Sequence, residues 1–307
     1  MTSASDVSAP GMSLPDPIAA GAGLRKWSPL LGPAISLAIL GAVLLQLREL
    51  NWSMIWSIIP RSPLVWLVLA ASYFAAPAAD WLIFRRLWNI PAAGFIPLVK
   101  KMIGNELLLG YVGEVYFYDW ARKHVKMEGS PFGAVKDVAI LSALAGNILT
   151  LAMLALAWPL IGLLGFGKDG NLMAMSIGIV LLTSLVIMFF RNGLLSLPRD
   201  ELIYTFVVHC LRVIANTGFA ALAWHLILPG VSLGSWLLLA TMRLLISRLP
   251  LIPNKDIAFA GVATLLVGEH LKIGVMIAMV SMLILATHVI LFLALTVLDA
   301  VRKEKAA

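Results

Sequence analysis

The sequence predicts an all-α polytopic membrane protein with about six transmembrane helices and two oppositely oriented re-entrant hairpins. Hydrophobic residues make up 61% of the 307 residues, and charged residues only 13%. The apolar residues form blocks of about 20 or more, which is the length that crosses a bilayer. Lys and Arg occur in short clusters beside these blocks, so the net charge of +7 indicates membrane topology and no nucleic-acid partner.

The two ends of the chain are predicted to be cytoplasmic. Residues 1–27 are mainly small and polar, and we expect a disordered tail there. Residues 28–300 are predicted to form a single integral membrane domain, whose first helix covers about 28–47 and follows the basic pair Arg25-Lys26. Residues 301–307 are predicted to form a basic cytoplasmic tail.

The segment 95–121 is predicted to be the first re-entrant hairpin. It follows a second helix over about 62–84, which ends at the basic pair Arg85-Arg86. Its own flanks, Lys100-Lys101 and the cluster from Arg122 to Lys126, are both basic, so the segment is expected to enter and leave on the same side. Its glycines allow the bends and close backbone approaches that such an element needs: Gly104, Gly110 and Gly113.

The segment 234–268 is predicted to be the second hairpin, open to the opposite side. Three full helices, over about 137–163, 172–190 and 202–228, precede it, and a last helix over about 272–299 ends at a basic tail. The hairpin is broken at Pro250 and Pro253 within the polar run Arg248 to Asp256. The alternative is about eight full spans, which would place the first hairpin's basic flank outside, against the positive-inside rule.

Charged residues around the second break are candidate substrate ligands. Arg243 and Ser247 share a helical face, Arg248 precedes the break, and Lys255 and Asp256 follow it. Charges at membrane depth are costly, so they are expected to line a cavity or to be paired. This balance of cations over one carboxylate favours an anion. The alternative is that Arg248 and Asp256 pair only to hold the hairpin together.

The first hairpin also carries a candidate site. Glu106, Gly110, Gly113 with Glu114, and Phe117 recur at helical spacing, which predicts that two carboxylates and two glycines share one face. Two neighbouring acids at low dielectric suit proton coupling or capture of a cationic headgroup. In the alternative reading, Lys100, Lys101 or Arg122 neutralises them. Asp80 is expected to be an interfacial counter-ion of Arg85-Arg86.

The helix over about 202–228 carries the clearest periodic signal of the chain. Thr205, His209, Arg212 and Asn216 follow one another at steps of four, three and four residues along an otherwise apolar span. Such a stripe is expected to face the interior of the bundle. It serves either a binding site or a hydrogen-bonded seam between helices.

The motifs of several enzyme classes are missing. The sequence contains no Gly-x-x-x-x-Gly-Lys-Ser/Thr phosphate loop, no His-Glu-x-x-His and no closely spaced set of His and Cys, and Cys210 is its only cysteine. We therefore expect no catalytic residues, no metal and no cofactor. A membrane enzyme that modifies lipids remains open.

Two polar segments resemble a known membrane family. Residues 104–117 lie where the flippase-like membrane domain of bacterial lysylphosphatidylglycerol synthases and its stand-alone relatives has an Asn-x-x-x-Pro-x-x-x-Gly-Glu-x-x-Arg segment. Residues 249–260 occupy the place of the family's late Pro-Gly-Gly-x-Gly-x-x-Glu break. The similarity extends over about 30–300. Phe117 replaces the family's arginine, and Asn254-Lys255 replace its glycines, so the chain is similar to a divergent member.

The resemblance implies translocation of a polar lipid between the leaflets of a bacterial cytoplasmic membrane, with membrane lipids as partners. The lipid would be an anionic or aminoacylated phospholipid or a lipid-linked sugar. In this reading Arg212, Arg243, Arg248 and Lys255 attract a phosphate, whereas Glu106 and Glu114 receive a cationic headgroup or a proton. The alternatives are a secondary transporter of a small polar solute and a non-transporting scaffold subunit. A homodimer or a membrane-protein partner is also open.

Overall fold

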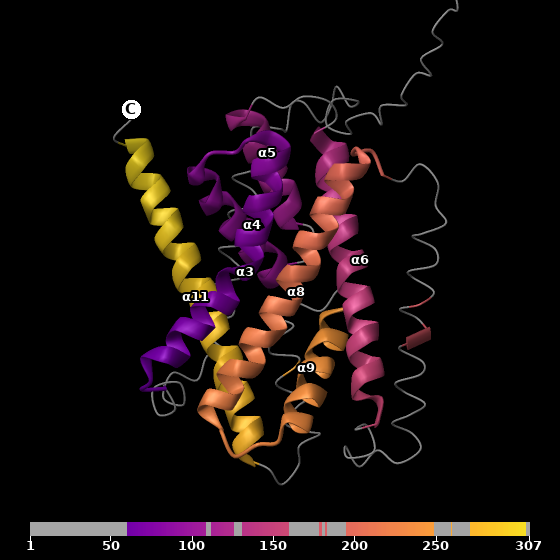
Figure 1. The fold of residues 1–307 in the computed structure, drawn as a ribbon. Coiled ribbons are helices and arrows are strands. Elements are labelled where there is room, and N and C mark those ends of the chain that lie inside the picture. Colours follow the sequence, from indigo (N-terminus) through magenta and orange to yellow (C-terminus); the bar gives the residue numbers. More distant parts are fainter. Residues whose placement is uncertain are drawn as a thin grey trace, which may run out of the picture.

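Helices form the whole of the regular structure in the part of the chain that is described (Figure 1). The computed structural model describes residues 60–108, 112–125, 131–159, 178–179, 182, 195–248, 259 and 271–304. Within these ranges, four helices are long and apolar enough to cross a membrane: α3 (Pro63–Trp88), α6 (Pro131–Ala157), α8 (Arg199–Ile227) and α11 (Leu271–Glu304). The protein is therefore an integral membrane protein.

The long helices run in two opposite directions. Followed by colour in Figure 1, α3 and α11 run towards the end of the bundle at which the C-terminus lies, and α6 and α8 run away from it. These relative directions agree with those expected from the charge clusters. The predicted helices over 28–47 and 172–190 and the half-helix over 257–268 lie outside the described residues.

The observed bounds of α6 differ from the prediction. The helix begins at Pro131 and ends at Ala157, earlier at both ends than the predicted span of about 137–163. Proline is favoured in the first helical turn, because the amide that it lacks has no partner there in any case. The charged pair Lys136-Asp137 therefore belongs to the helix. The hydropathy of the sequence places the start of the helix after Lys136, because charged residues are rare in membrane spans.

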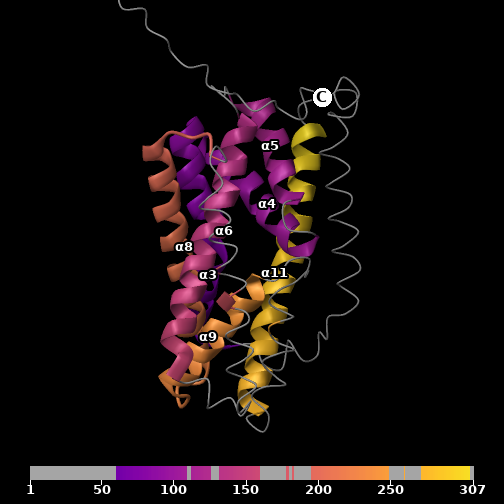
Figure 2. The same cartoon turned by 90° about the vertical axis from the view of Figure 1, so that its right-hand side faces the viewer.

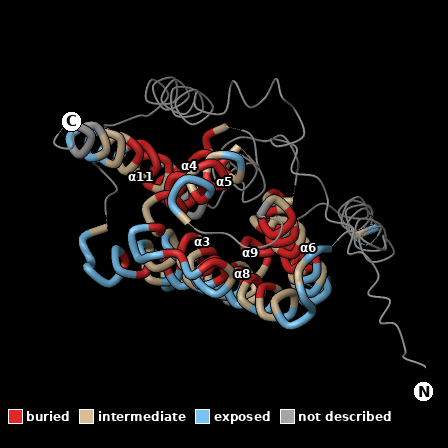
Figure 3. Tube along the Cα trace, turned by 90° about the horizontal axis from the view of Figure 1, so that it is seen from above, coloured by how far each residue is buried: buried red, intermediate tan, exposed pale blue. Residues whose placement is uncertain are grey.

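α8 lies at the centre of the helix packing. It contacts α3 on one side and α6 on the other, and α9 and α11 also touch it. Seen along the bundle, the outer faces of α3 and α8 are exposed, whereas their inner faces are buried against the remaining helices (Figure 3). Large apolar side chains cover the outer faces, for example Leu67 at 68% exposure and Leu211 at 60%. An outward apolar surface of this kind is typical of helices in contact with lipid.

Three shorter helices complete the described fold. A single 3-10 turn, η1 (Ala92–Gly94), leads into α4 (Phe95–Leu107), which packs against α5 (Val112–His124). The third is α9 (Leu233–Ser247), whose N-cap Ser232 accepts a hydrogen bond from the Ser235 amide. Helices of 13 and 15 residues are about 20 Å long, less than the ~30 Å of a bilayer core.

The short helices approach the middle of the bundle from opposite ends. Figure 2 shows α4 and α5 in the half that contains the C-terminus and α9 in the other half. Lys100 on α4 pairs with Asp299 near the C-terminal end of α11. At the opposite end of the bundle, Thr241 of α9 contacts the carbonyl of Met153 near the C-terminal end of α6. The C-terminal ends of α4 and α9 both reach α8, where Glu106, Arg243 and Asn216 line one cavity.

Candidate functional site

Two adjoining cavities lie where the ends of α4 and α9 meet the middle of α3 and α8. We call them the polar cavity, of about 180 Å³, and the apolar cavity, of about 120 Å³. Both are far larger than the ~15 Å³ needed to admit a water molecule. Four residues line both cavities: Ala76, Glu106, Asn216 and Arg243.

The polar cavity brings together residues that the sequence marked on separate segments. Arg212 and Asn216 come from the stripe on α8, and Arg243 and Arg248 come from the end of α9. Glu106 comes from the last turn of α4. The lining described thus holds three cations and one carboxylate, and it includes the hydroxyl-bearing residues Thr217 and Ser247. Cations therefore outnumber carboxylates among the described residues of this lining.

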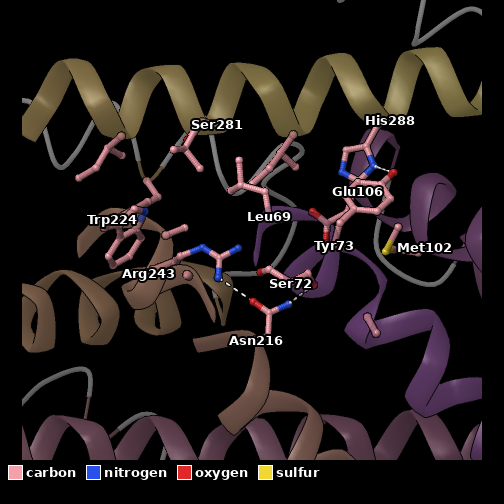
Figure 4. A pocket seen from close by; sticks show the side chains of 17 residues that line it. Leu69, Ser72, Tyr73, Met102, Glu106, Asn216, Trp224, Arg243, Ser281 and His288 are labelled. Atoms are coloured by element: carbon pink, nitrogen blue, oxygen red, sulfur yellow. Dashed lines mark hydrogen bonds between the residues drawn. The ribbon is translucent and has the colours of Figure 1, made fainter. Parts of the chain in front are cut away.

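The apolar cavity extends from the shared residues towards α11. Its walls are mainly apolar: Leu69, Met102, Ala220, Ala223, Trp224, Phe259, Ile277, Val280 and Ile284. Four further polar residues line it, namely Ser72 and Tyr73 of α3 and Ser281 and His288 of α11. Figure 4 shows these groups around the Glu106 carboxylate and the Arg243 guanidinium.

Hydrogen bonds tie the shared residues to three helices (Figure 4). Arg243 donates from Nη1 to Oδ1 of Asn216 at 2.9 Å, and Nδ2 of Asn216 donates to the carbonyl of Ser72 at 3.4 Å. The hydroxyl of Tyr73 is 2.7 Å from Nδ1 of His288, which joins α3 to α11. Figure 4 shows the Glu106 carboxylate beside Tyr73. These links fix the orientation of the polar groups at the border between the two cavities.

The polar stripe of α8 faces inward, as its spacing predicted. Thr205 and His209 are buried, with exposed fractions of 0% and 1%, and the His209 ring lies beside the backbone of Val138 on α6. Arg212 and Asn216, further along the same helix, line the polar cavity. Among the described residues, the stripe is therefore packed against the neighbouring helices in one half, without the hydrogen bonds of the expected seam at Thr205 and His209, and it forms a cavity wall in the other half.

A second buried cluster lies between α3, α4 and α5. Nζ of Lys101 is 2.6 Å from Oδ2 of Asp80 and 3.4 Å from Oε1 of Glu114. The expectation that Asp80 is a counter-ion of Arg85-Arg86 is therefore wrong, since its carboxylate is buried and bonded to Lys101. Glu114 pairs with Lys101, one of the three cations that the alternative reading named. Neither carboxylate of this cluster lines either cavity.

The prediction that Glu106 and Glu114 share one helical face is wrong. α4 ends at Leu107 and α5 begins at Val112, so the helical register does not continue from one glutamate to the other. Glu106 lines the cavities, whereas Glu114 contacts Lys101. Helical spacing indicates a shared face only while the helix is unbroken.

Gly113 closes the contact between α4 and α5. Its amide donates to Oδ1 of Asn105 at 2.8 Å, and a Cβ at this position would overlap the backbone carbonyl of Lys101. The close backbone approach expected at Gly113 is confirmed. Three further candidates, Gly110, Lys255 and Asp256, lie outside the described residues.

Several residues of the site carried no signal in the sequence. Ser72 and Tyr73 belong to an apolar run, and His288 is isolated on its helix. Ser142 and Gly146 on α6 contact Arg212 and Arg248, respectively. Ser142 and Gly146 are four residues apart and so share one face of α6. The sequence alone does not show that this face contacts the two arginines. Among the described residues, no group of three His, Cys, Asp or Glu side chains could hold a metal ion.

Comparison with known proteins gave no match to any family model, curated protein or solved structure.

Proposed function

We propose that this protein translocates a polar lipid with an anionic headgroup between the leaflets of a bacterial cytoplasmic membrane. The observation that carries the proposal is the polar cavity at mid-depth, where the described lining places Arg212, Arg243 and Arg248 together with the carboxylate of Glu106. Each of these arginines is partly buried. Cations within a membrane domain are costly unless they are paired or serve a function. A phosphate group complements three guanidinium groups, each of which offers several donors in a fixed plane.

The proposed topology places the C-terminal end of α11 in the cytoplasm. Basic residues gather at this end of the bundle: Arg85, Arg86, Arg122, Lys123 and Arg199. The positive-inside rule assigns such an end to the cytoplasm, and we place both termini there. In this proposal α4 and α5 form a re-entrant hairpin from the cytoplasmic side, and α9 is the described half of a second hairpin from the outer side. Broken elements that meet near the midplane are a recurrent feature of transporters.

In the proposed mechanism, the headgroup crosses through the polar cavity. The arginines of α8 and α9 replace the water around the phosphate, while the Glu106 carboxylate accepts hydrogen bonds from an ammonium or a hydroxyl group of the headgroup. The adjoining apolar cavity admits the part of the lipid next to the headgroup, because its wall is formed by side chains such as Leu69 and Trp224. The acyl chains remain in the surrounding lipid.

The proposal is tested in liposomes that contain the purified protein. Tagged anionic and zwitterionic phospholipids are followed by the accessibility of each leaflet, first with wild type and then with Arg243→Gln and Arg248→Gln. Arg61→Gln is the matched control, since Arg61 is exposed beside the start of α3. We expect wild type and the control to move the anionic lipid, and each cavity variant to lose at least about tenfold in rate, the cost of losing a charged hydrogen bond.

Two results would contradict the proposal. One is equal movement of anionic lipid by wild type, both cavity variants and empty liposomes. The other is uptake of a small polar anion into the liposomes without any lipid movement, which would identify a solute transporter. Folding of each variant is checked by its melting temperature in detergent, so that a misfolded protein is not mistaken for an inactive site.

A further inference from the structure

We propose that Ser142 and Gly146 of α6 are positioning residues that hold Arg212 and Arg248 in the polar cavity and thereby set the affinity of the site for an anion. The two residues are four apart and share one face of α6. This inference rests on the function proposed above for the same cavity, and it adds a helix that does not line the cavity itself.

Ser142 holds the first arginine. Nη2 of Arg212 donates to Oγ of Ser142 at 3.0 Å, across the interface between α8 and α6. A guanidinium has a planar set of donors, so one fixed hydrogen bond restricts the direction of the others. Ser142 thus determines which donors of Arg212 face the cavity.

Gly146 provides the place for the second arginine. A Cβ added at Gly146 would lie 2.6 Å from Cζ of Arg248 and 3.0 Å from its Nη2, so the guanidinium lies directly against the backbone of α6. Nε of Arg248 donates to Oγ of Ser247 at 3.0 Å. Only glycine leaves the space that this position of the guanidinium needs.

Thr150 lies one turn beyond Gly146 on the same face of α6. Thr150, four residues beyond Gly146, is fully buried, and its hydroxyl donates to the Gly146 carbonyl at 2.7 Å. Its hydrogen bond thus returns to the backbone of its own helix. On this face of α6 the Thr150 hydroxyl is already hydrogen-bonded within the helix. The position of Arg248 therefore depends on the absence of a side chain at Gly146.

Gly146→Ala is expected to displace the Arg248 side chain without destabilising the fold. The added methyl group meets the end of a flexible side chain, so the guanidinium moves while the backbone stays. Alanine also favours the helix over glycine by about 1 kcal/mol. Gly218→Ala on α8 is the matched control, because a Cβ there has nothing within 4 Å.

The first readout is the apparent Kd for inorganic phosphate, obtained in detergent from the rise in melting temperature on titration. We expect Gly146→Ala and Ser142→Ala each to weaken phosphate binding about tenfold and Gly218→Ala to leave it unchanged. The second readout is a double-mutant cycle, in which Gly146→Ala causes no further loss when Arg248 is already Ala. A purely structural role would cost the same in both backgrounds.

The outcomes are distinct. The inference is overturned if Gly146→Ala behaves like Gly218→Ala, if its loss persists in the Arg248→Ala background, or if wild type shows no response to phosphate. The proposed function fails separately, if wild-type protein in liposomes moves no lipid while the phosphate cycle keeps the expected pattern.

Discussion

The guanidinium of Arg243 on α9 and the side-chain amide of Asn216 on α8 are joined by a hydrogen bond of 2.9 Å at the border of the two cavities. This bond connects the end of a short helix to the middle of a long one. Asn216 also reaches the carbonyl of Ser72 on α3. One amide thus links three helices at the level where the charged groups converge.

Asn216→Leu is expected to slow translocation of an anionic lipid by about tenfold, since Arg243 loses the acceptor that orients it. The measurement is the initial rate in liposomes, with the melting temperature taken on the same preparation. Asn216→Gln, which keeps an amide oxygen, is the conservative comparison. A rate for the leucine variant equal to that of wild type would show that the orientation of Arg243 does not matter.

Lys101→Met is expected to destabilise the protein by about 3 to 5 kcal/mol, because the Asp80 carboxylate is then left charged and buried. Lys123→Met is the matched control: Lys123 pairs with Asp119 on α5, but its side chain is 48% exposed, so its loss is expected to cost less than about 1 kcal/mol. The check is the melting temperature in detergent. Similar losses of stability in Lys101→Met and Lys123→Met would contradict a stabilising role of the buried pair between Lys101 and Asp80.

The double variant Asp80→Asn with Lys101→Met extends this test. Removing both charges together leaves no uncompensated ion in the interior, so we expect most of the lost stability to return. A double variant that melts as low as Lys101→Met alone would mean that Lys101 stabilises the fold through other contacts.

Gly113→Ala is expected to destabilise the protein by about 1 to 3 kcal/mol. The new methyl group would overlap the Lys101 carbonyl and approach Oδ1 of Asn105 to 2.7 Å, and neither α4 nor α5 can yield without losing their mutual contact. Gly218→Ala serves again as the control and should be neutral or slightly stabilising. The melting temperatures of Gly113→Ala and Gly218→Ala are compared by thermal unfolding. Equal values would show that the close contact at Gly113 does not limit the size of the side chain there.

Tyr73→Phe is expected to lower stability by about 1 to 3 kcal/mol, because it removes a hydrogen-bond partner of the buried His288 ring without changing the shape of the side chain. A suitable comparison is His124→Gln, since the His124 ring bonds to the Trp120 carbonyl at an exposed position. Melting curves of the two variants test this directly. A larger loss for the exposed histidine would contradict the role of the α3 to α11 link.

The long helices could be predicted because a bilayer imposes a length and a composition that are visible in one sequence. The stripe on α8 was also predictable, since the spacing from Thr205 to Asn216 stays on one face while the helix is unbroken. Arg243 and Arg248 were candidates because cations are rare in apolar sequence. In each case the information is local, and the structure brings Arg212, Asn216, Arg243 and Arg248 to one cavity.

Pairings between distant elements could not be predicted. Asp80 and Lys101 are 21 residues apart, and Tyr73 and His288 are 215 apart, so no periodicity connects them. The assignment of Asp80 to the neighbouring arginines was wrong, because nearness along the chain was taken for nearness in space. A glycine such as Gly146 gives no signal until the side chain that lies on it is known.

The central claim is that an anionic lipid occupies the cavities at mid-depth, and photo-crosslinking with a phospholipid that carries its reactive group beside the phosphate tests this most directly. The account predicts adducts on the cavity wall, at Leu69 and Trp224, that disappear when Arg243 and Arg248 are both replaced by Gln. Adducts found only on the outer face, at residues such as Leu211, with equal yield in wild type and variant, would contradict it.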